Sequence, residues 1–430
     1  MKYQKQKIKK GITLHNIETD KFKTNLISIF LTTPISREYV TFNSLISSIL
    51  RRGSKNLPTS EEISKTMEEM YGASFDSGVD KIGDNHILKF YLESINDEYI
   101  PHDEENMLKE SIEKIVEIVF NPYIENETFK EEYLEQEKEN MRQRIIGKVD
   151  NKASYAKARC IEEMYKGEPA GLYRYGYVED LDKINSKNLY EYYKSLISEC
   201  KIDIFVSGKI TNDDTLSILN ENETIKKLKE RDAKYIINNI EEKQKQEEKK
   251  IEEIQDVAQG KIVIGCDICF NKEDLKDSNL KYEALVYNNL LGGSANSKLF
   301  QNVREKASLA YTVNSNYVRF KSNIFINAGI EIQNYEKAIS IIKEQIKSME
   351  KGEFTEEEIK NAKKGIISNI NLIDDEQDSQ IMYFYGQELI ESNDTLKDYK
   401  EKINNVTKED ILKIASSINI NTIYFLKNNR

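Results

Sequence analysis

The chain contains two copies of one pattern about 240 residues apart, and this repeat limits the fold more than any other feature. Residues 40–54 (VTFNSLISSILRRGS) and 281–294 (KYEALVYNNLLGGS) both show the apolar spacing of an amphipathic helix. Each stretch ends in Gly-Ser, and a tyrosine follows that glycine by 18 residues, at Tyr71 and Tyr311. A repeat of this length predicts two domains with the same fold.

A second match supports the duplication at a slightly shorter spacing. Residues 129–145 and 354–370 both start with Phe, continue with acidic residues suited to the first turn of a helix, and end with Ile. Asp150 and Asp375 follow in the same register. The change of offset from 240 to 225 places about 15 additional residues in the first half. We expect them in the two loop-like segments 96–108 and 121–127.

Each half also contains apolar segments typical of strands and longer segments with helical spacing. The expected strands are 26–33, 85–94 and 201–208 in the first half, and 261–270, 323–332 and 421–427 in the second. The clearest expected helices are 109–120 and 335–350. The sequence therefore predicts an α+β fold of two similar lobes, each an antiparallel sheet packed with helices.

The predicted lobes are separated by a charged segment with almost no apolar periodicity. It contains the run EEKQKQEEKKIEEIQ, which is typical of a linker or a solvated helix. The predicted organisation is thus an N-terminal lobe at 1–220, a charged linker at 221–258 and a C-terminal lobe at 259–430.

Composition excludes some classes of partner. The 430 residues carry a net charge of −11, whereas a nucleic-acid-binding surface is normally basic. The basic N-terminus is not followed by the apolar stretch of a secretory signal. No run of the sequence approaches the 18 apolar residues that suggest a membrane helix. We therefore expect a cytoplasmic protein that binds neither nucleic acid nor membranes.

The residues that usually bind zinc are few and scattered. The four cysteines are Cys160, Cys200, Cys266 and Cys269. The last two have C-x-x-C spacing but lie in an apolar strand-like segment, and zinc would need a second pair of ligands. The three histidines are His15, His86 and His102, each isolated from the others. The sequence therefore predicts neither a zinc site nor a histidine base.

The most specific segment is 290–315, LLGGSANSKLFQNVREKASLAYTVNS. Two glycines end a helix, a second helix follows at 297–307, and a strand starts near residue 309. Arg304 and Tyr311 lie seven residues apart across this junction, so both side chains can reach one spot. A guanidinium and a phenol are donors suited to a peptide carbonyl or an oxyanion. The residues alone favour a surface arginine beside a half-buried tyrosine, with no shared role.

Segment 290–315 and the two-lobe repeat resemble the insulinase-like (pitrilysin, M16) metallopeptidases over nearly the full length of the chain. The resemblance implies that Arg304 and Tyr311 are the pair that helps to hold the substrate carbonyl. In that family, zinc is bound by an H-x-x-E-H motif on a helix and by a later glutamate. Counting back from the Gly-Ser turn places the motif on Ser44, Ser47 and Ser48, and the later ligand position falls on Arg144, seven residues after Glu137.

All four of these positions carry residues unsuited to zinc. Hydroxyls do not replace imidazoles as ligands, and a guanidinium would repel the ion. Helical spacing alone explains the serines as the polar side of a helix whose apolar face starts at Phe42. The resemblance adds that they occupy the degenerate positions of the motif. We therefore expect no catalytic residue, no bound metal and no other cofactor in this chain, with zinc only in a partner subunit.

The resemblance implies a non-catalytic, substrate-contacting subunit of a heterodimeric zinc peptidase, which complements a partner carrying H-x-x-E-H. Segments 72–78 and 312–318 are candidate edges for pairing with an extended peptide substrate. Within the family, the chain most resembles proteins of low-GC Gram-positive bacteria associated with the 5-aminopentanone modification of elongation factor P. These occur as a metal-lacking member beside a zinc-bearing one.

Two alternatives remain open at this point. The chain could be an inert scaffold or interaction protein of the same fold, with no role in peptide cleavage. A self-sufficient hydrolase is disfavoured, because no histidine or lysine near the serines in sequence would activate one of them as a nucleophile. Self-association of the isolated chain also stays open.

Overall fold

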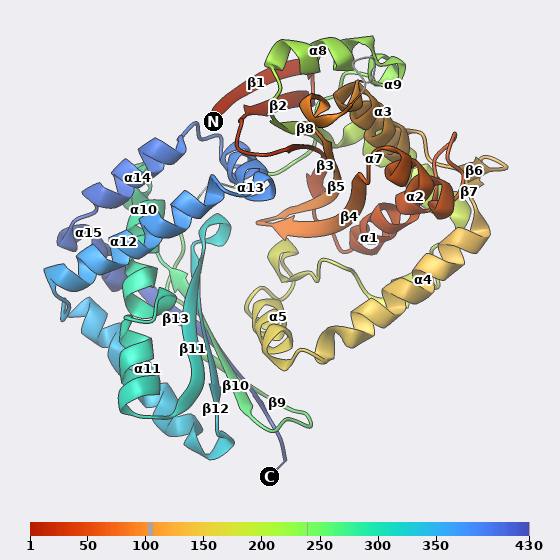
Figure 1. The fold of residues 1–430 in the computed structure, drawn as a ribbon. Helices are drawn as coiled ribbons and strands as arrows, with labels where there is room; N and C mark the ends of the chain where they lie inside the picture. Colours follow the sequence, from red (N-terminus) through yellow and green to blue (C-terminus); the bar gives the residue numbers. More distant parts are fainter. Residues whose placement is uncertain (102–105, 239, 430) are drawn as a thin grey trace. The chain divides into compact units, whose positions relative to one another are not determined.

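The computed structural model describes residues 1–101, 106–238 and 240–429. The chain forms two compact units, each assembled from three parts of the sequence (Figure 1). Unit 1 comprises Met1–Gly147, Leu172–Ile237 and Ile373–Leu389, and unit 2 comprises Lys148–Gly171, Asn238–Leu372 and Ile390–Arg430. In the part of the chain that is described, each helix is too short or too polar to cross a bilayer.

Unit 1 is built on a six-stranded sheet. Its strands, in spatial order, are β1 (Lys2–Lys9), β2 (Ile12–Glu18), β8 (Lys201–Gly208), β3 (Thr24–Pro34), β5 (Asn85–Ile95) and β4 (Ser74–Ile82). Strands β2 and β8 are parallel, and every other neighbouring pair is antiparallel. A short hairpin of β6 (Ile124–Glu125) and β7 (Thr128–Phe129) lies apart from this sheet.

Unit 2 is built on a five-stranded sheet. Its strands, in spatial order, are β11 (Ala310–Val318), β12 (Asn323–Ile330), β10 (Gly260–Ile268), β13 (Ile418–Lys427) and β9 (Lys249–Ile254). Strands β13 and β9 are parallel, and the other neighbouring pairs are antiparallel.

The helices divide between the two units. Unit 1 contains α1 (Val40–Ile49), α2 (Ser60–Glu69), α3 (Met107–Phe120), α4 (Glu131–Ile146), α6 (Val178–Leu181), α7 (Ser186–Glu199), α8 (Asn212–Glu221), α9 (Glu223–Lys227) and α13 (Gln377–Glu388). Unit 2 contains α5 (Lys152–Met164), α10 (Leu280–Asn288), α11 (Tyr335–Glu350), most of α12 (Glu356–Ile373), α14 (Leu396–Asn405) and α15 (Lys408–Ser417).

The two units repeat one topology. The order β2-β8-β3-β5-β4 in unit 1 corresponds to β9-β13-β10-β12-β11 in unit 2, with the parallel pair at the same place. Helices α1 and α10 start at Val40 and Leu280, and helices α4 and α12 start at Glu131 and Glu356. The first pair is separated by 240 residues and the second by 225, the two offsets found in the sequence. The prediction of an α+β protein with two similar lobes is confirmed.

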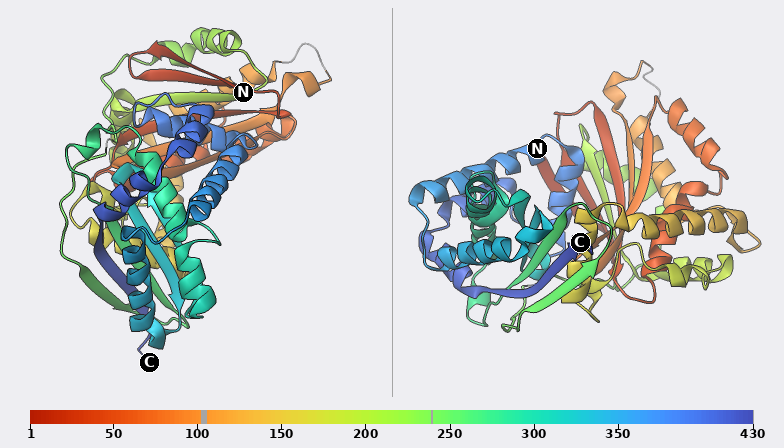
Figure 2. Two further views of the ribbon diagram at one scale, coloured as in Figure 1. Left: turned by 90° about the vertical axis from the view of Figure 1, so that its left-hand side faces the viewer. Right: turned by 90° about the horizontal axis from the view of Figure 1, so that it is seen from below.

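Both faces of each sheet are covered by helices (Figure 2). In unit 1, Ile27, Ile29 and Leu31 of β3 belong to a fully buried core, on the face where α1, α3 and α7 pack. The intervening Phe30 and Thr32 meet Tyr385 of α13, through a ring contact at 4.9 Å and a hydrogen bond of 2.6 Å. In unit 2, α5 covers one face of the sheet, while α10 and α15 contact strands β11 and β10.

Helices α5 and α13 are exchanged between the repeats. They start at Lys152 and Gln377, at the same offset as α4 and α12, and are therefore equivalent in the duplication. Yet α5 belongs to unit 2, although most of the first half forms unit 1, and α13 belongs to unit 1. Apolar periodicity does not reveal this exchange, because it shows that a helix has a buried face and not which sheet covers that face.

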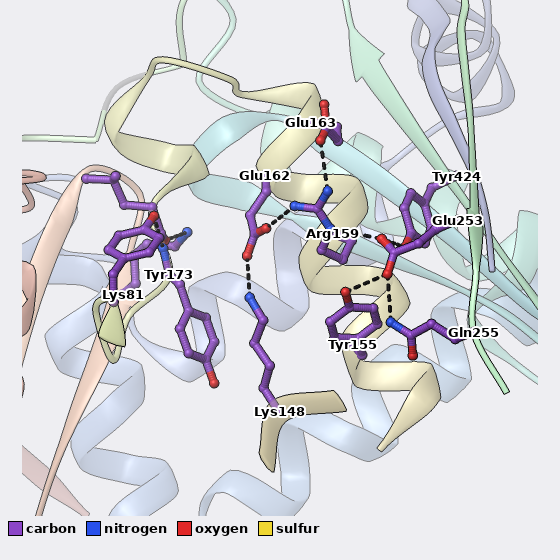
Figure 3. Close-up of polar contacts among 12 residues, drawn as sticks. Lys81, Lys148, Tyr155, Arg159, Glu162, Glu163, Tyr173, Glu253, Gln255 and Tyr424 are labelled. Carbon is purple, nitrogen blue, oxygen red and sulfur yellow. Dashed lines mark hydrogen bonds and ion pairs between the residues drawn. The ribbon is translucent and has the colours of Figure 1, made fainter. Parts of the chain in front are cut away.

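The charged segment between the repeats contains an edge strand where the sequence predicts a linker or solvated helix. Residues 249–254 form β9, which pairs in parallel with β13. The Glu253 carboxylate accepts hydrogen bonds of 2.6 Å from the hydroxyls of both Tyr155 and Tyr424, and it pairs with Arg159 of α5 at 3.2 Å (Figure 3). The charge of Glu253 on β9 is thus compensated by partners that are distant in sequence.

Candidate functional site

A pocket of about 480 Å³ lies in unit 1, among α1, α4 and the edge strand β4. Helix α1 packs against both α4 and β4, which brings these elements together. The pocket gathers the serines and the arginine that the sequence analysis singled out. Its lining residues are Ser44, Ser47, Ser48, Arg51, Arg52, Ser60, Ser77, Gly78, Val79, Glu137, Asn140, Gln143, Arg144 and Tyr175.

The serine hydroxyls of α1 are engaged mainly with backbone carbonyls. The Ser44 hydroxyl lies 3.2 Å from the carbonyl oxygen of Val40 and 2.9 Å from that of Arg174. The Ser48 hydroxyl donates to the carbonyl of Ser44 at 3.3 Å. Bonds from serine back to the preceding turn are a common way to satisfy a hydroxyl within a helix. Ser44 and Ser48 therefore occupy structural roles.

Helix α4 contributes Glu137 and Arg144 to the pocket. One carboxylate oxygen of Glu137 accepts bonds from Arg52 at 3.4 Å and from Asn140 at 3.3 Å. The Arg144 guanidinium lies over the ring of Tyr175, 5.2 Å from its centroid. Hydroxyls, amides and guanidinium groups dominate the lining, and these side chains do not fit a zinc ion. Nowhere in the described residues do three His, Cys, Asp or Glu side chains come together as a metal site.

The described histidines are buried in unit 1 and kept neutral. Burial lowers the pKa of His86 to about 4, and its ring lies 3.1 Å from the Asn43 side-chain amide. Burial also lowers the pKa of His15, which bonds Asp203 at 2.9 Å and Tyr3 at 2.8 Å. His102 lies outside the described residues.

The cysteines behave as buried apolar side chains. All four are free thiols, and Cys160, Cys200 and Cys266 are buried. Burial raises the pKa of both Cys160 and Cys200 to about 12, so neither forms a thiolate near neutral pH.

Arg304 and Tyr311 both lie at the surface of unit 2. Arg304 belongs to a helical turn, Phe300–Lys306, with its guanidinium 4.7 Å from the Phe300 ring centroid and 3.8 Å from the carboxylate of Glu305. Tyr311 is 53% exposed, and its hydroxyl lies 3.4 Å from the Glu331 carboxylate. Tyr311 is thus one of the exposed large side chains of the described residues.

Tyr311 occupies a β-bulge at the start of an edge strand. The register between β11 and β12 shifts between Ala310 and Thr312, so Tyr311 is the residue left without a partner across the strand pair. A bulge turns a side chain away from the regular alternation of a strand. The sequence does not reveal it, because a bulge depends on the register between two strands.

Comparison with known proteins identifies the family. Residues 183–366 match the model of the peptidase M16 inactive domain. Over 420 residues the chain is 35% identical to a Bacillus subtilis (strain 168) protein described as probable inactive metalloprotease YmfF, covering 97% of this chain and 96% of that protein. The chain belongs to the M16 peptidase family. It is a non-catalytic, insulinase-like member.

Two further comparisons concern a solved structure and a second relative. A crystal structure of a conserved protein from Enterococcus faecalis V583 has a TM-score of 0.87 and 27% identity, covering 99% of both chains. A second Bacillus subtilis (strain 168) protein, described as uncharacterized zinc protease YmxG, is 27% identical over 140 residues, which are 32% of this chain and 34% of that protein.

The sequence singled out only part of the M16 pocket in unit 1. The structure places Ser44, Ser47, Ser48 and Arg144 around one pocket. It also adds residues that the sequence analysis missed, including Arg51, Arg52 and Tyr175. The adjacent Arg51 and Arg52, directly after α1, are the sequence feature that could have indicated a positively charged pocket.

Proposed function

We propose that this M16 chain is the substrate-contacting, non-catalytic subunit of a heterodimeric zinc peptidase of the cytoplasm. The proposal rests chiefly on one observation: Arg304 and Tyr311 are exposed on unit 2, and Tyr311 is set on a bulge. A residue used only for packing is normally buried against its neighbours. In a chain whose pocket carries no zinc ligands, an exposed guanidinium and phenol are best explained by contact with a substrate.

The chemistry expected of this pair is hydrogen-bond donation. Both groups can donate to the carbonyl oxygen of a bound peptide, and this interaction strengthens as negative charge develops on that oxygen. The partner subunit would supply zinc and its bound water. This chain would hold and orient the peptide.

The edges of the two sheets support peptide binding. Strands β4 and β11 each end the strand order of their sheet, and they overlap the candidate segments 72–78 and 312–318. An extended peptide adds to such an edge through main-chain hydrogen bonds. The existence of zinc-protease relatives supports a zinc-bearing M16 partner.

The test is a mixing experiment with a zinc-bearing M16 protein from the same organism. We expect the purified chain alone to cleave no peptide and the mixture to cleave faster than the partner alone. Arg304→Ala should reduce the stimulated rate about 100-fold, the scale of losing one oxyanion donor, and Tyr311→Phe should also reduce it. Lys306→Ala, on the same helical turn, is the matched control and should keep the stimulation.

Binding of the two chains separates the proposal from the scaffold alternative. If the Arg304→Ala, Tyr311→Phe double variant still binds the partner but stimulates it fully, the chain acts as a scaffold. If one zinc ion binds tightly to the isolated chain, the assignment of zinc to the partner is wrong.

A further inference from the structure

The pocket of unit 1 has a charge opposite to that of the protein as a whole. The chain carries a net charge of −11, yet the lining contains three arginines, Arg51, Arg52 and Arg144, and one carboxylate, Glu137. Arg52 is already committed, since it pairs with Glu137 at 3.4 Å and lies 5.1 Å from the ring centroid of Tyr133. Of the other two, Arg51 has only an exposed ion pair with Asp76, so Arg51 and Arg144 leave the pocket positive.

Arg144 is the guanidinium most available to a ligand. It is exposed, and its guanidinium lies 5.2 Å from the centroid of the Tyr175 ring. Arg174 lies over the same ring at 4.9 Å and pairs with Asp80 at 3.3 Å. Across the described residues, Arg144 has no carboxylate within ion-pair distance. Its fork of donors is thus open to an anion.

Two further features favour an anionic occupant. Arg51 pairs with Asp76 at 3.1 Å, but the side chains are 47% and 75% exposed, so this pair is weak and exchangeable. The buried Nε of Arg52 has no acceptor within the described part of the chain. Serine hydroxyls, including those of Ser47 and Ser60, add donors around the same space.

We propose that this pocket binds a carboxylate carried by a peptide. Ser77, Gly78 and Val79 of the edge strand β4 line it, so a peptide paired along β4 would place a side chain or its chain end there. A Cβ built on Gly78 meets nothing within 4 Å, which leaves the approach open. The inference rests on the proposed function only in taking a peptide as the source of the carboxylate.

The experiment uses the isolated full chain and three peptides of one neutral sequence. The first is amidated, the second is amidated and carries a single glutamate, and the third has a free C-terminus. Calorimetry should show about tenfold tighter binding for at least one acidic peptide than for the neutral amide, and the preferred peptide identifies the source of the carboxylate. The preference should shrink at higher salt.

Variants on α4 test the role of Arg144. Arg144→Gln should remove the preference for the acidic peptide, while Arg144→Lys should retain part of it. Arg142→Gln is the matched control on the same helix, because Arg142 pairs with Asp182 at 2.9 Å and does not line the pocket. Thermal midpoints confirm that each variant folds.

A variant that adds a negative charge gives an independent test. Ser48→Asp places a carboxylate inside the positive pocket, so the acidic peptide should lose its advantage, and the thermal midpoint checks that the variant folds. The proposal is overturned if the three peptides bind alike, if none binds, or if Arg144→Gln or Ser48→Asp leaves the preference intact. The assay needs neither partner nor Arg304, so its failure is distinct from failure of the proposed function.

Discussion

Removing Lys201 should destabilise unit 1 far more than removing a lysine from its surface. The Lys201 side chain is 6% exposed and pairs with Asp203, whose side chain is wholly buried, and with Glu388 of α13 at 3.2 Å. His15 also bonds Asp203, but burial keeps that imidazole neutral by lowering its pKa. Lys201 is therefore the cation that compensates the buried carboxylate.

The magnitude follows from leaving a buried charge unpaired. Loss of one partner of a buried ion pair costs about 3–5 kcal/mol. Glu388 keeps Lys5 as a partner at 2.6 Å, so most of the cost falls on Asp203 and the lower value, about 3 kcal/mol, is expected for Lys201→Met. Lys2 and Glu18, separated by 3.5 Å with side chains 65% and 40% exposed, form the matched surface pair. Lys2→Met should cost less than about 1 kcal/mol.

The assay must report on unit 1 alone, because a protein with two units need not unfold in one step. Amide hydrogen exchange along β8, where all eight residues are buried, meets this need. Lys201→Met should accelerate exchange there about 100-fold. Adding Asp203→Asn should restore much of the protection. If Lys201→Met exchanges as slowly as Lys2→Met, or if Asp203→Asn gives no recovery, the reasoning is wrong.

Two other predictions concern acid and backbone crowding. Burial alone would raise the pKa of Asp203, but Lys201 and His15 outweigh it and lower that pKa from 3.8 to about 2. Asp203 should thus stabilise unit 1 by about 2 kcal/mol above pH 4, and this stability should be lost as the pH falls toward 2. Exchange in β8 measured from pH 5 to 2 would show it, and an unchanged pH slope in Asp203→Asn would contradict it. Gly53→Ala should reduce the free energy of unfolding by about 2 kcal/mol and lower the thermal midpoint, because a Cβ at Gly53 would lie within 2.6 Å of the Pro58 carbonyl. Gly78→Ala has open space around the added Cβ, so its free energy of unfolding should change by less than about 0.5 kcal/mol. Equal midpoints for the two variants would show that the crowding at Gly53 is relieved.

Much of the fold could be predicted because the duplicated elements carry local signals. The expected strand 26–33 lies within β3, and the expected helix 335–350 coincides with α11. Both have apolar residues at the spacing of their secondary structure. Strand β9 carried no such signal, because it is highly charged and its Glu253 finds its partners, Tyr155, Tyr424 and Arg159, elsewhere in the chain. The spacing of apolar residues along the chain does not reveal hydrogen bonds between residues that are distant in sequence.

Some features of the candidate sites could also be predicted from the sequence, and others could not. Positions 44, 47 and 48 share one helix, so the sequence could place them together, and the family resemblance added Arg144. The bulge at Tyr311 depends on how β11 pairs with β12. The charge of the pocket depends on Arg51 and Arg52, from the turn after α1, meeting Arg144 from α4. Neither feature has a local sequence signal.

The exchange of α5 and α13 also explains why sequence repeats and folded units differ in this protein. Without α13, the face of the unit 1 sheet that carries Phe30 and Thr32 would lose the Tyr385 contacts that cover it. Apolar burial contributes about 25 cal/mol per Å², so exposing aromatic side chains on one face would cost several kcal/mol. The stability of unit 1 therefore depends on residues 377–388, which come from the second repeat. Each half of the sequence thus supplies a helix that packs on the sheet of the unit formed mainly by the other half.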